Sequence, residues 1–195
     1  MQKGIKKLNQ TYNNIKKTAF NQDTNCCTVI SASVVFEKDY DETHAFFKDR
    51  GRKNGKGLRT YLLEPILFEL AELEGFTIEL FTRHWNYNED GKLRMVTWEN
   101  EDREETITYA KTDKSINLKN FRDYLPKGDY ILGVRGHVVG VKNGVIQDWT
   151  ANVYDRKTGK NRTSQKVLDR IYKIEKKNKV FKDLKKSKYD FSKFI

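Results

Sequence analysis

The segment that most constrains the fold is "GHVVGVKNGVIQDW", residues 136–149, in which two short β-branched runs flank an Asn-Gly step. Asn143 and Gly144 favour a type I′ turn, because both central residues of that turn need positive φ and these residue types tolerate it. A two-residue loop also fixes the register of the hairpin that it closes. The predicted pairs are Lys142 with Val145, Val141 with Ile146, Gly140 with Gln147, Val139 with Asp148, and His137 with Thr150.

This register places an imidazole and a carboxylate on one face of the sheet. Directly opposed residues, and residues two apart on one strand, share a face, so His137 and Asp148 are diagonal neighbours. Their separation is about 7 Å, which two side chains of this size can close with a hydrogen bond. A solvent-facing polar pair is the alternative interpretation. Against it, the glycines Gly136 and Gly140 are typical of a sheet that is closely covered on both sides.

Upstream of the hairpin, the spacing of apolar residues changes from helical to alternating. The predicted helices are a buried one from near Cys26 behind the cap-like run 23–25, one capped by Asp41 and ending at Gly51, and one from Pro65 to Gly75. The Val and Ile content of the first also suits a strand. The predicted strands are 76–81, 92–98, 106–111, 129–135, 137–142 and 144–149, with a short helix in 117–128. Residues 165–175 fit a strand or a helix. Helices followed by an antiparallel sheet indicate the α+β class.

The length of 195 residues and the 37% hydrophobic content suit one well-cored domain. We expect it to span residues 21–175, between a basic extension at 1–20 and a lysine-rich tail at 176–195. Neither a membrane-spanning run nor a signal peptide is evident, so we expect no membrane contact and a cytoplasmic location, in a host cytoplasm if the protein is phage-encoded. The two cysteines are neighbours and cannot cross-link distant segments, so we expect reduced thiols.

The formal net charge of +11 raises the hypothesis of nucleic-acid binding, since clustered Lys and Arg release counterions from phosphate backbones. Much of the excess lies in the two terminal segments, whereas the middle of the chain is mixed in sign. A charge run is more often a solvated face than a binding site. We therefore treat nucleic acid as an alternative partner, bound through the basic termini.

Cys27 is the candidate nucleophile. In the first turn of the predicted helix, unpaired N–H groups and the helix dipole would stabilise a thiolate and lower the thiol pKa. A nearby imidazole would make it an ion-pair nucleophile. The alternative interpretation of a buried cysteine, which holds for Cys26 in particular, is a small hydrophobic core residue.

A thiol at a helix start, followed by a histidine and an aspartate on neighbouring strands, resembles the papain-like cysteine peptidases, in particular small phage and bacterial proteins of that fold. The resemblance covers roughly residues 20–150 and is carried by "NCCTVISASVVF", Tyr40, "GRKNGKG" and "GDYILGVRGHVVGVKNGVIQDW". The part that carries the histidine and the aspartate is much more specific than the part that carries the cysteine. The resemblance implies a papain-like domain with N-terminal helices packed on an antiparallel sheet.

The resemblance also implies roles for individual residues. Cys27 would be the nucleophile, His137 the base, and Asp148 the residue that orients the base. Cys27 is preferred to Cys26 because its spacing to Tyr40 matches the family's interval, although the family commonly has Asp in the position before the nucleophile. Papain-like enzymes use an amide side chain shortly before the nucleophile as an oxyanion donor, and here Asn21 and Gln22 are the candidates.

The expected activity is hydrolysis of a peptide, isopeptide or related amide bond in a protein or peptide substrate, with no cofactor. The same residues support transglutamination, deamidation or thioester hydrolysis. His44 and His84 are expected to be surface or packing residues, since no further ligand stands at metal-site spacing. Two alternatives remain: a non-enzymatic basic protein on a papain-like scaffold that docks nucleic acid or a host protein, and a host-takeover factor that binds one host protein.

Overall fold

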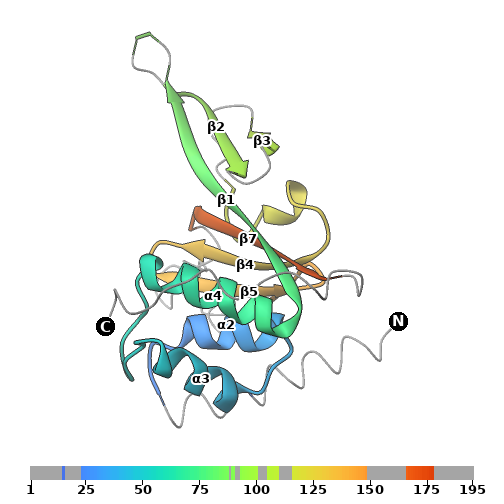
Figure 1. Cartoon of the computed structure of the whole chain (residues 1–195). Coiled ribbons are helices and arrows are strands. Elements are labelled where there is room, and N and C mark those ends of the chain that lie inside the picture. The colour runs from blue at the N-terminus through green and yellow to red at the C-terminus, as the bar shows by residue number, and fades with distance from the viewer. Residues whose placement is uncertain are drawn as a thin grey trace, which may run out of the picture.

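The computed structural model describes residue 15 and residues 23–87, 89–90, 93–100, 105–109, 116–148 and 166–177. Within these segments, helices come first and an antiparallel sheet follows (Figure 1), so the chain is α+β as the sequence predicts. The helices are α2 (Cys27–Val35), α3 (Tyr40–Asp49), α4 (Thr60–Glu74) and the 3₁₀ turn η1 (Phe121–Asp123). The strands are β1 (Phe76–Tyr87), β2 (Leu93–Asn100), β3 (Glu105–Tyr109), β4 (Asp129–Val134), β5 (His137–Lys142), β6 (Val145–Gln147) and β7 (Leu168–Lys176).

The seven strands form one sheet in the order β3-β2-β1-β7-β4-β5-β6, with every pairing antiparallel. The segment whose sequence fits both a strand and a helix is strand β7, which lies between β1 and β4 and pairs with both. Its buried residues do not alternate strictly, because a central strand is covered on both faces. Strand β7 thus joins the hairpins β1–β2 and β4–β5 into one sheet.

Helix α2 begins where the sequence predicts, and eight of its nine residues are buried. This excludes the strand alternative for the segment. The cap-like run 23–25 does not cap it, since Cys26 is the N-cap residue and makes no side-chain capping bond. The aspartate of this run, Asp23, instead turns its carboxylate toward the loop that follows α3.

The starts of α3 and α4 differ from the sequence predictions. Asp39, rather than Asp41, caps α3: its carboxylate accepts hydrogen bonds from the N–H groups of Asp41 and Glu42, at 2.8 and 3.2 Å. Helix α4 begins at Thr60, so that Pro65 lies inside it, and ends at Gly75 with φ 75° as predicted. The helix extends one turn earlier because Leu63 continues its buried apolar stripe.

The predicted short helix in 117–128 reduces to the single 3₁₀ turn η1. The side chains of Asn117 and Asn120 occupy main-chain donors at its start: Asn117 accepts from the N–H of Asn120 at 3.1 Å, and Asn120 accepts from the N–H of Asn117 at 2.8 Å. Asparagine side chains that satisfy nearby main-chain groups favour turns over helices.

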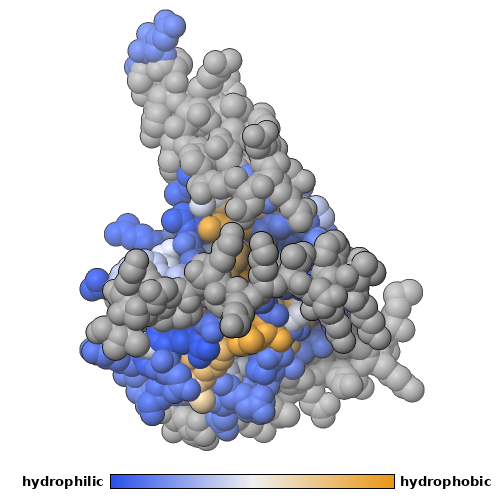
Figure 2. Space-filling view, viewed as in Figure 1, coloured by the Kyte–Doolittle hydropathy of each residue, from blue (hydrophilic) through white to orange (hydrophobic). Residues whose placement is uncertain are grey.

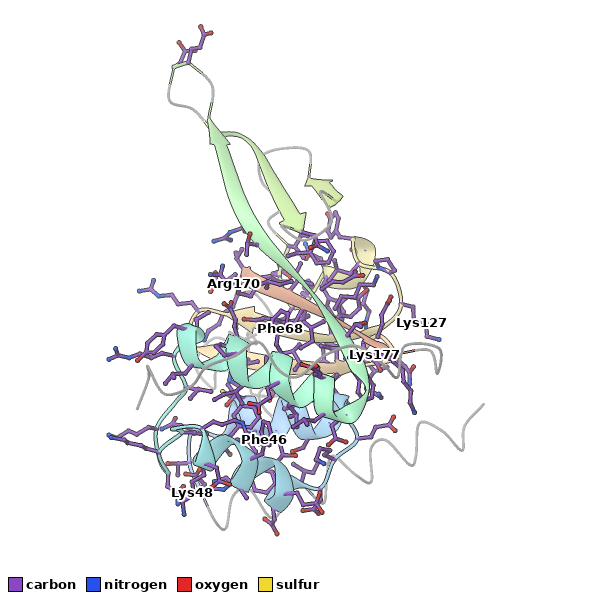
Figure 3. All side chains as sticks on the ribbon, in the orientation of Figure 1. Phe46, Lys48, Phe68, Lys127, Arg170 and Lys177 are labelled. Carbon is purple, nitrogen blue, oxygen red and sulfur yellow. The ribbon has the colours of Figure 1, made fainter. Side chains whose placement is uncertain are left out.

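The sheet has an apolar core on each face. Helices α2, α3 and α4 cover one face, where Ile131, Tyr172 and Ile174 of the sheet meet the buried helical residues. Phe46 of α3 and Phe68 of α4 lie partly buried at the edge of this core (Figure 3). The second core lies on the other face, around Phe121, and includes the strand residues Leu132, Val139 and Val141. The tight covering predicted from the glycines therefore holds for β4 and β5.

Polar residues dominate the described surface in the view of Figure 2, with apolar side chains showing in a central strip. Beyond the body of the fold, the far half of β1 extends with β2 and β3 as an arm (Figure 1). Among the described residues, no helix has the length and apolar character needed to cross a bilayer.

Candidate active site

The β5–β6 hairpin has the turn and the register that its sequence predicts. Asn143 and Gly144 have φ of 52° and 75°, as a type I′ turn requires. The observed pairs are Lys142 with Val145, Val141 with Ile146, and Gly140 with Gln147. The predicted pair of Val139 with Asp148 is not part of the ladder, because β6 ends at Gln147. The predicted partner of His137, Thr150, lies outside the described residues.

His137 and Asp148 form a direct, buried pair. Nε2 of the imidazole lies 2.8 Å from Oδ2 of the carboxylate, and the two side chains are 10% and 4% exposed. A solvent-facing polar pair would be far more exposed, so that alternative does not describe this hairpin. Because the carboxylate engages Nε2, the second ring nitrogen, Nδ1, is left for another partner.

That partner is the thiol of Cys27. The residue opens α2, is partly exposed, and hydrogen-bonds through its sulfur to the His137 side chain and to the main-chain N–H of Val138. Val138 also accepts a hydrogen bond from the Ser31 hydroxyl, one turn further along α2, at 3.3 Å. Helix α2 and strand β5 therefore bring together the three residues Cys27, His137 and Asp148.

The electrostatics of this group favour a charged pair. Burial alone raises the pKa of the Cys27 thiol, but the hydrogen bond and positive charge of His137 outweigh it, so the pKa is lowered. Burial likewise disfavours the charged imidazole, yet the hydrogen bonds to Asp148 and Cys27 raise the pKa of His137 to about 9. The arrangement therefore favours the charge pair of thiolate and imidazolium relative to two isolated side chains.

Cys26 points away from this group, into the core. It is 8% exposed, and its thiol donates a long hydrogen bond of 3.9 Å to the Asp23 carbonyl. The hydroxyl of Tyr40 lies beside it, and burial raises the pKa of the Cys26 thiol. The structure thus brings Cys27, and not Cys26, to the imidazole.

The segment before Cys27 is held by a buried ion pair that the sequence analysis missed. Arg52 lies 2.6 Å from the Asp23 carboxylate, and the two side chains are 0% and 1% exposed. The same carboxylate accepts from the N–H groups of Thr24 and Gly55 at 2.7 and 2.5 Å. His44 completes the set at 3.0 Å, so it is part of a polar network rather than a surface residue.

The network lowers the pKa of Asp23 to about 2, because the hydrogen bonds from Gly55, His44 and Arg52 outweigh the effect of burial. Asn25 adds a further tie, donating from Nδ2 to the Gly55 carbonyl at 2.9 Å. Together these contacts fasten the segment before Cys27 to the loop after α3. Little in the sequence predicts these contacts. Asp23 has the features of a helix-capping residue, and Arg52 stands in the Gly- and Lys-rich segment 51–57, which resembles a solvated loop.

The structure gives less information about the remaining candidate residues from the sequence, namely the oxyanion donors and His84. Asn21 and Gln22, the candidate oxyanion donors, lie outside the described residues. The main-chain N–H of Cys27 is in the first turn of α2, where it has no acceptor within the helix. His84 lies in β1 opposite Thr97. Within the described segments, no group of three or more His, Cys, Asp and Glu side chains is arranged to hold a metal ion.

Comparisons of the chain with protein-family models, with curated proteins and with solved structures returned no match.

Proposed function

We propose that the protein is a papain-like cysteine hydrolase that cleaves a peptide, isopeptide or related amide bond by acyl transfer. The observation that carries the proposal is the chain of contacts from the Cys27 sulfur to His137 and on to Asp148. A thiol that hydrogen-bonds an imidazole, which is itself oriented by a buried carboxylate, is the arrangement that activates a cysteine nucleophile.

The chemistry follows from these positions. The Cys27 thiolate adds to the substrate carbonyl, and the Cys27 N–H is placed to donate to the oxyanion. His137, charged at this stage, donates its Nδ1 proton to the leaving amine as the C–N bond breaks, which leaves a thioester. Neutral His137 then takes a proton from water as the water attacks the thioester, which releases the acid and restores the Cys27 thiolate beside the charged imidazole. Asp148 holds the ring so that Nδ1 faces the sulfur.

The papain-like assignment is supported by the layout of the site. The thiol begins a buried helix, and the helix lies on an antiparallel sheet whose strand β5 starts with the histidine. The aspartate follows directly after the next strand along the chain, β6. Fold and site thus agree in chain order, helix position and strand position with what the sequence resemblance implies.

A substrate screen tests the proposal. The protein is incubated with libraries of fluorogenic peptides and with isopeptide-linked conjugates, and Cys27→Ala is compared with Cys26→Ala. We expect amide cleavage that Cys27→Ala abolishes and that Cys26→Ala leaves within about threefold, since only the first removes the nucleophile. Cleavage that survives in Cys27→Ala would exclude the proposed mechanism.

A second candidate function, a basic protein that docks nucleic acid or a host protein, is favoured by the formal net charge of +11. The lysine-rich tail that carries much of this charge lies mostly outside the described residues. Retention on DNA, measured against salt with and without residues 178–195, separates the two functions. Steep salt dependence that the truncation removes would support docking. We propose the cytoplasm as the location for either function.

A further inference from the structure

Helix α2 runs along strand β5 in the same direction and contacts it from its first residue to its last. At the first, Cys27 meets His137 and Val138. At the last, eight residues further along the helix, the carbonyl of Val35 meets Lys142. The catalytic contact and the Lys142 contact therefore lie at opposite ends of one helix–strand interface.

The middle contact sets how closely the helix approaches the strand. A Cβ atom on Gly140 would lie 3.2 Å from both Cα and O of Ser31, so a side chain there would push the helix away. This contact limits the separation of helix and strand. It fixes the position of α2 along β5 less well, because a glycine offers no side chain to interlock with the helix and the nearby Ser31–Val138 hydrogen bond is long, at 3.3 Å.

Lys142 supplies a directional tie at the far end. Its ammonium group donates to the Val35 carbonyl at 2.9 Å and lies 2.7 Å from the Asp129 carboxylate and 3.1 Å from Glu37. The residue is only 6% exposed. Buried lysines are rare without partners, and a cation is favourable at the C-terminal end of a helix dipole.

Asp129 connects this tie to the hairpin turn. Its second carboxylate oxygen accepts from the N–H of Asn143 at 2.7 Å. The end of α2 is thus fixed to the same hairpin that holds His137. One rigid unit, β5 with its turn, contacts both ends of the helix.

We propose that Lys142 is a positioning residue that fixes where α2 sits along β5, and so sets Cys27 at the level of His137. The inference rests on the proposed function of the same site and adds a residue to it. Without the tie, apolar packing and the 3.3 Å Ser31–Val138 hydrogen bond still hold α2 on β5, but the C-terminal end of the helix loses its polar anchor. A resulting displacement of about 1 Å at a reacting group can cost about 100-fold in rate.

A direct effect of the Lys142 charge on the thiol is the competing explanation. Cys27 and Val35 are eight residues apart, so the two ends of the helix are separated by about 12 Å. Over that distance, Lys142 acts together with the carboxylates of Asp129 and Glu37, which oppose its charge. The double variant separates the two explanations. If Lys142 acts only through its electric field, the effects of Lys142→Met and His137→Ala on the thiol add; if it acts by positioning Cys27 at His137, the combined effect is less than additive.

The experiment measures the rate of Cys27 alkylation by iodoacetamide against pH in the full-length protein, resolved from Cys26 by peptide mass spectrometry. The variants are Lys142→Met, His137→Ala and the double variant. We expect Lys142→Met to raise the midpoint pH for Cys27 by about one unit, which slows labelling about tenfold at mildly acidic pH. We expect His137→Ala to slow labelling only about tenfold further in the Lys142→Met background, because the displaced imidazole already stabilises the thiolate less.

Lys173→Met is the matched control. Lys173 lies in β7, and its ion-pair partners, the buried Glu79 at 3.1 Å and Glu175 at 2.8 Å, belong to β1 and β7 rather than to α2. We expect this variant to lose stability and to keep the wild-type midpoint. A folded Lys142→Met protein with an unchanged midpoint, or with an effect fully additive to that of His137→Ala, would overturn the proposal.

Asp129→Asn covers the case in which Lys142→Met does not fold. Asparagine can still accept a hydrogen bond from the N–H of Asn143, but its neutral amide binds the Lys142 ammonium group more weakly than a carboxylate does. We therefore expect a smaller shift of the midpoint, with the same sign. An unchanged midpoint in folded Asp129→Asn would then count against the proposal. Failure of the proposed function is distinct, since it would show as an ordinary Cys27 midpoint in the wild-type protein itself.

Discussion

Cys26 and Cys27 are adjacent in the chain, and both lie at the N-terminal end of α2, yet their environments oppose each other. Cys27 faces the sheet and meets His137, and its pKa is lowered. Cys26 faces the helical core beside Tyr40, and its pKa is raised. The positive end of the helix dipole is common to both thiols, so it cannot be what separates them. The imidazole is the deciding difference.

The largest expected effect comes from removing one thiol at a time. We expect Cys27→Ser to abolish labelling by a thiol-directed electrophile at mildly acidic pH, because only Cys27 is expected to be ionised there. Cys26→Ser should leave the labelling rate within about twofold, since the buried thiol contributes nothing. Electrophile labelling followed by mass spectrometry checks both variants. Equal losses in the two would mean that the thiols are not distinct.

The next effect is a conversion of Cys27 into an ordinary thiol. In His137→Ala, we expect its pKa to rise toward that of an ordinary thiol, which slows alkylation at mildly acidic pH by roughly 100-fold. The pKa of Cys26 should not move, because its raised value comes mainly from burial. The pH profile of each peptide's alkylation rate measures the change. A Cys27 profile that is insensitive to His137→Ala would show that the helix terminus alone sets its ionisation.

The hydrogen-bond network around the Asp23 carboxylate predicts that the free energy of unfolding depends on pH. The pKa of Asp23 is lowered from 3.8 to about 2, so its contribution is fully present above pH 4 and is lost as the pH falls through about 2. The size is about 2 kcal/mol, since one pKa unit corresponds to about 1.4 kcal/mol. Urea unfolding between pH 5 and pH 2 measures it, and Asp23→Asn should flatten this part of the pH dependence.

Arg52→Met tests the same network from the other partner. It leaves the buried Asp23 carboxylate without its guanidinium, and breaking a buried pair in this way costs about 3–5 kcal/mol. If the variant stays folded, we expect Cys26 to become more accessible to alkylation while His137 still lowers the pKa of Cys27. Unchanged stability to urea would show that the buried pair is not needed to hold the loop.

The smallest effect is expected from Tyr40→Phe. The hydroxyl interacts with the Cys26 thiol, so its loss should alter the environment of Cys26 rather than that of Cys27. We expect the Cys27 labelling profile to coincide with that of the wild-type protein. A shift at Cys27 would mean that the two sides of the helix terminus are coupled.

The sequence predicts most reliably what local rules decide. Asn143-Gly144 determines its own turn, and the turn determines the register of β5 and β6 as far as the pair Gly140–Gln147. Gly75 ends α4 for an equally local reason. The pairing of His137 with Asp148 needs nothing beyond one hairpin, and the sequence therefore predicts it.

Contacts between distant residues were not predictable in this way. The Asp23–Arg52 pair joins two loops, and the Lys142–Val35 contact spans 107 positions. The chain has 38 Lys and Arg residues, most of which the sequence predicts to be solvated. Residue type and spacing do not show which of them is buried. The position of β7 is likewise set by partners on both sides rather than by its own pattern.

The central claim is that the thiol of Cys27 and the imidazole of His137 titrate as one unit. NMR titration of the His137 ring in wild-type protein and in Cys27→Ser measures this directly. The account predicts a ring pKa near 9 that falls clearly in the variant, because one of the bonds that favour the imidazolium is lost. A ring that titrates near 6.5 and does not respond to Cys27→Ser would contradict it.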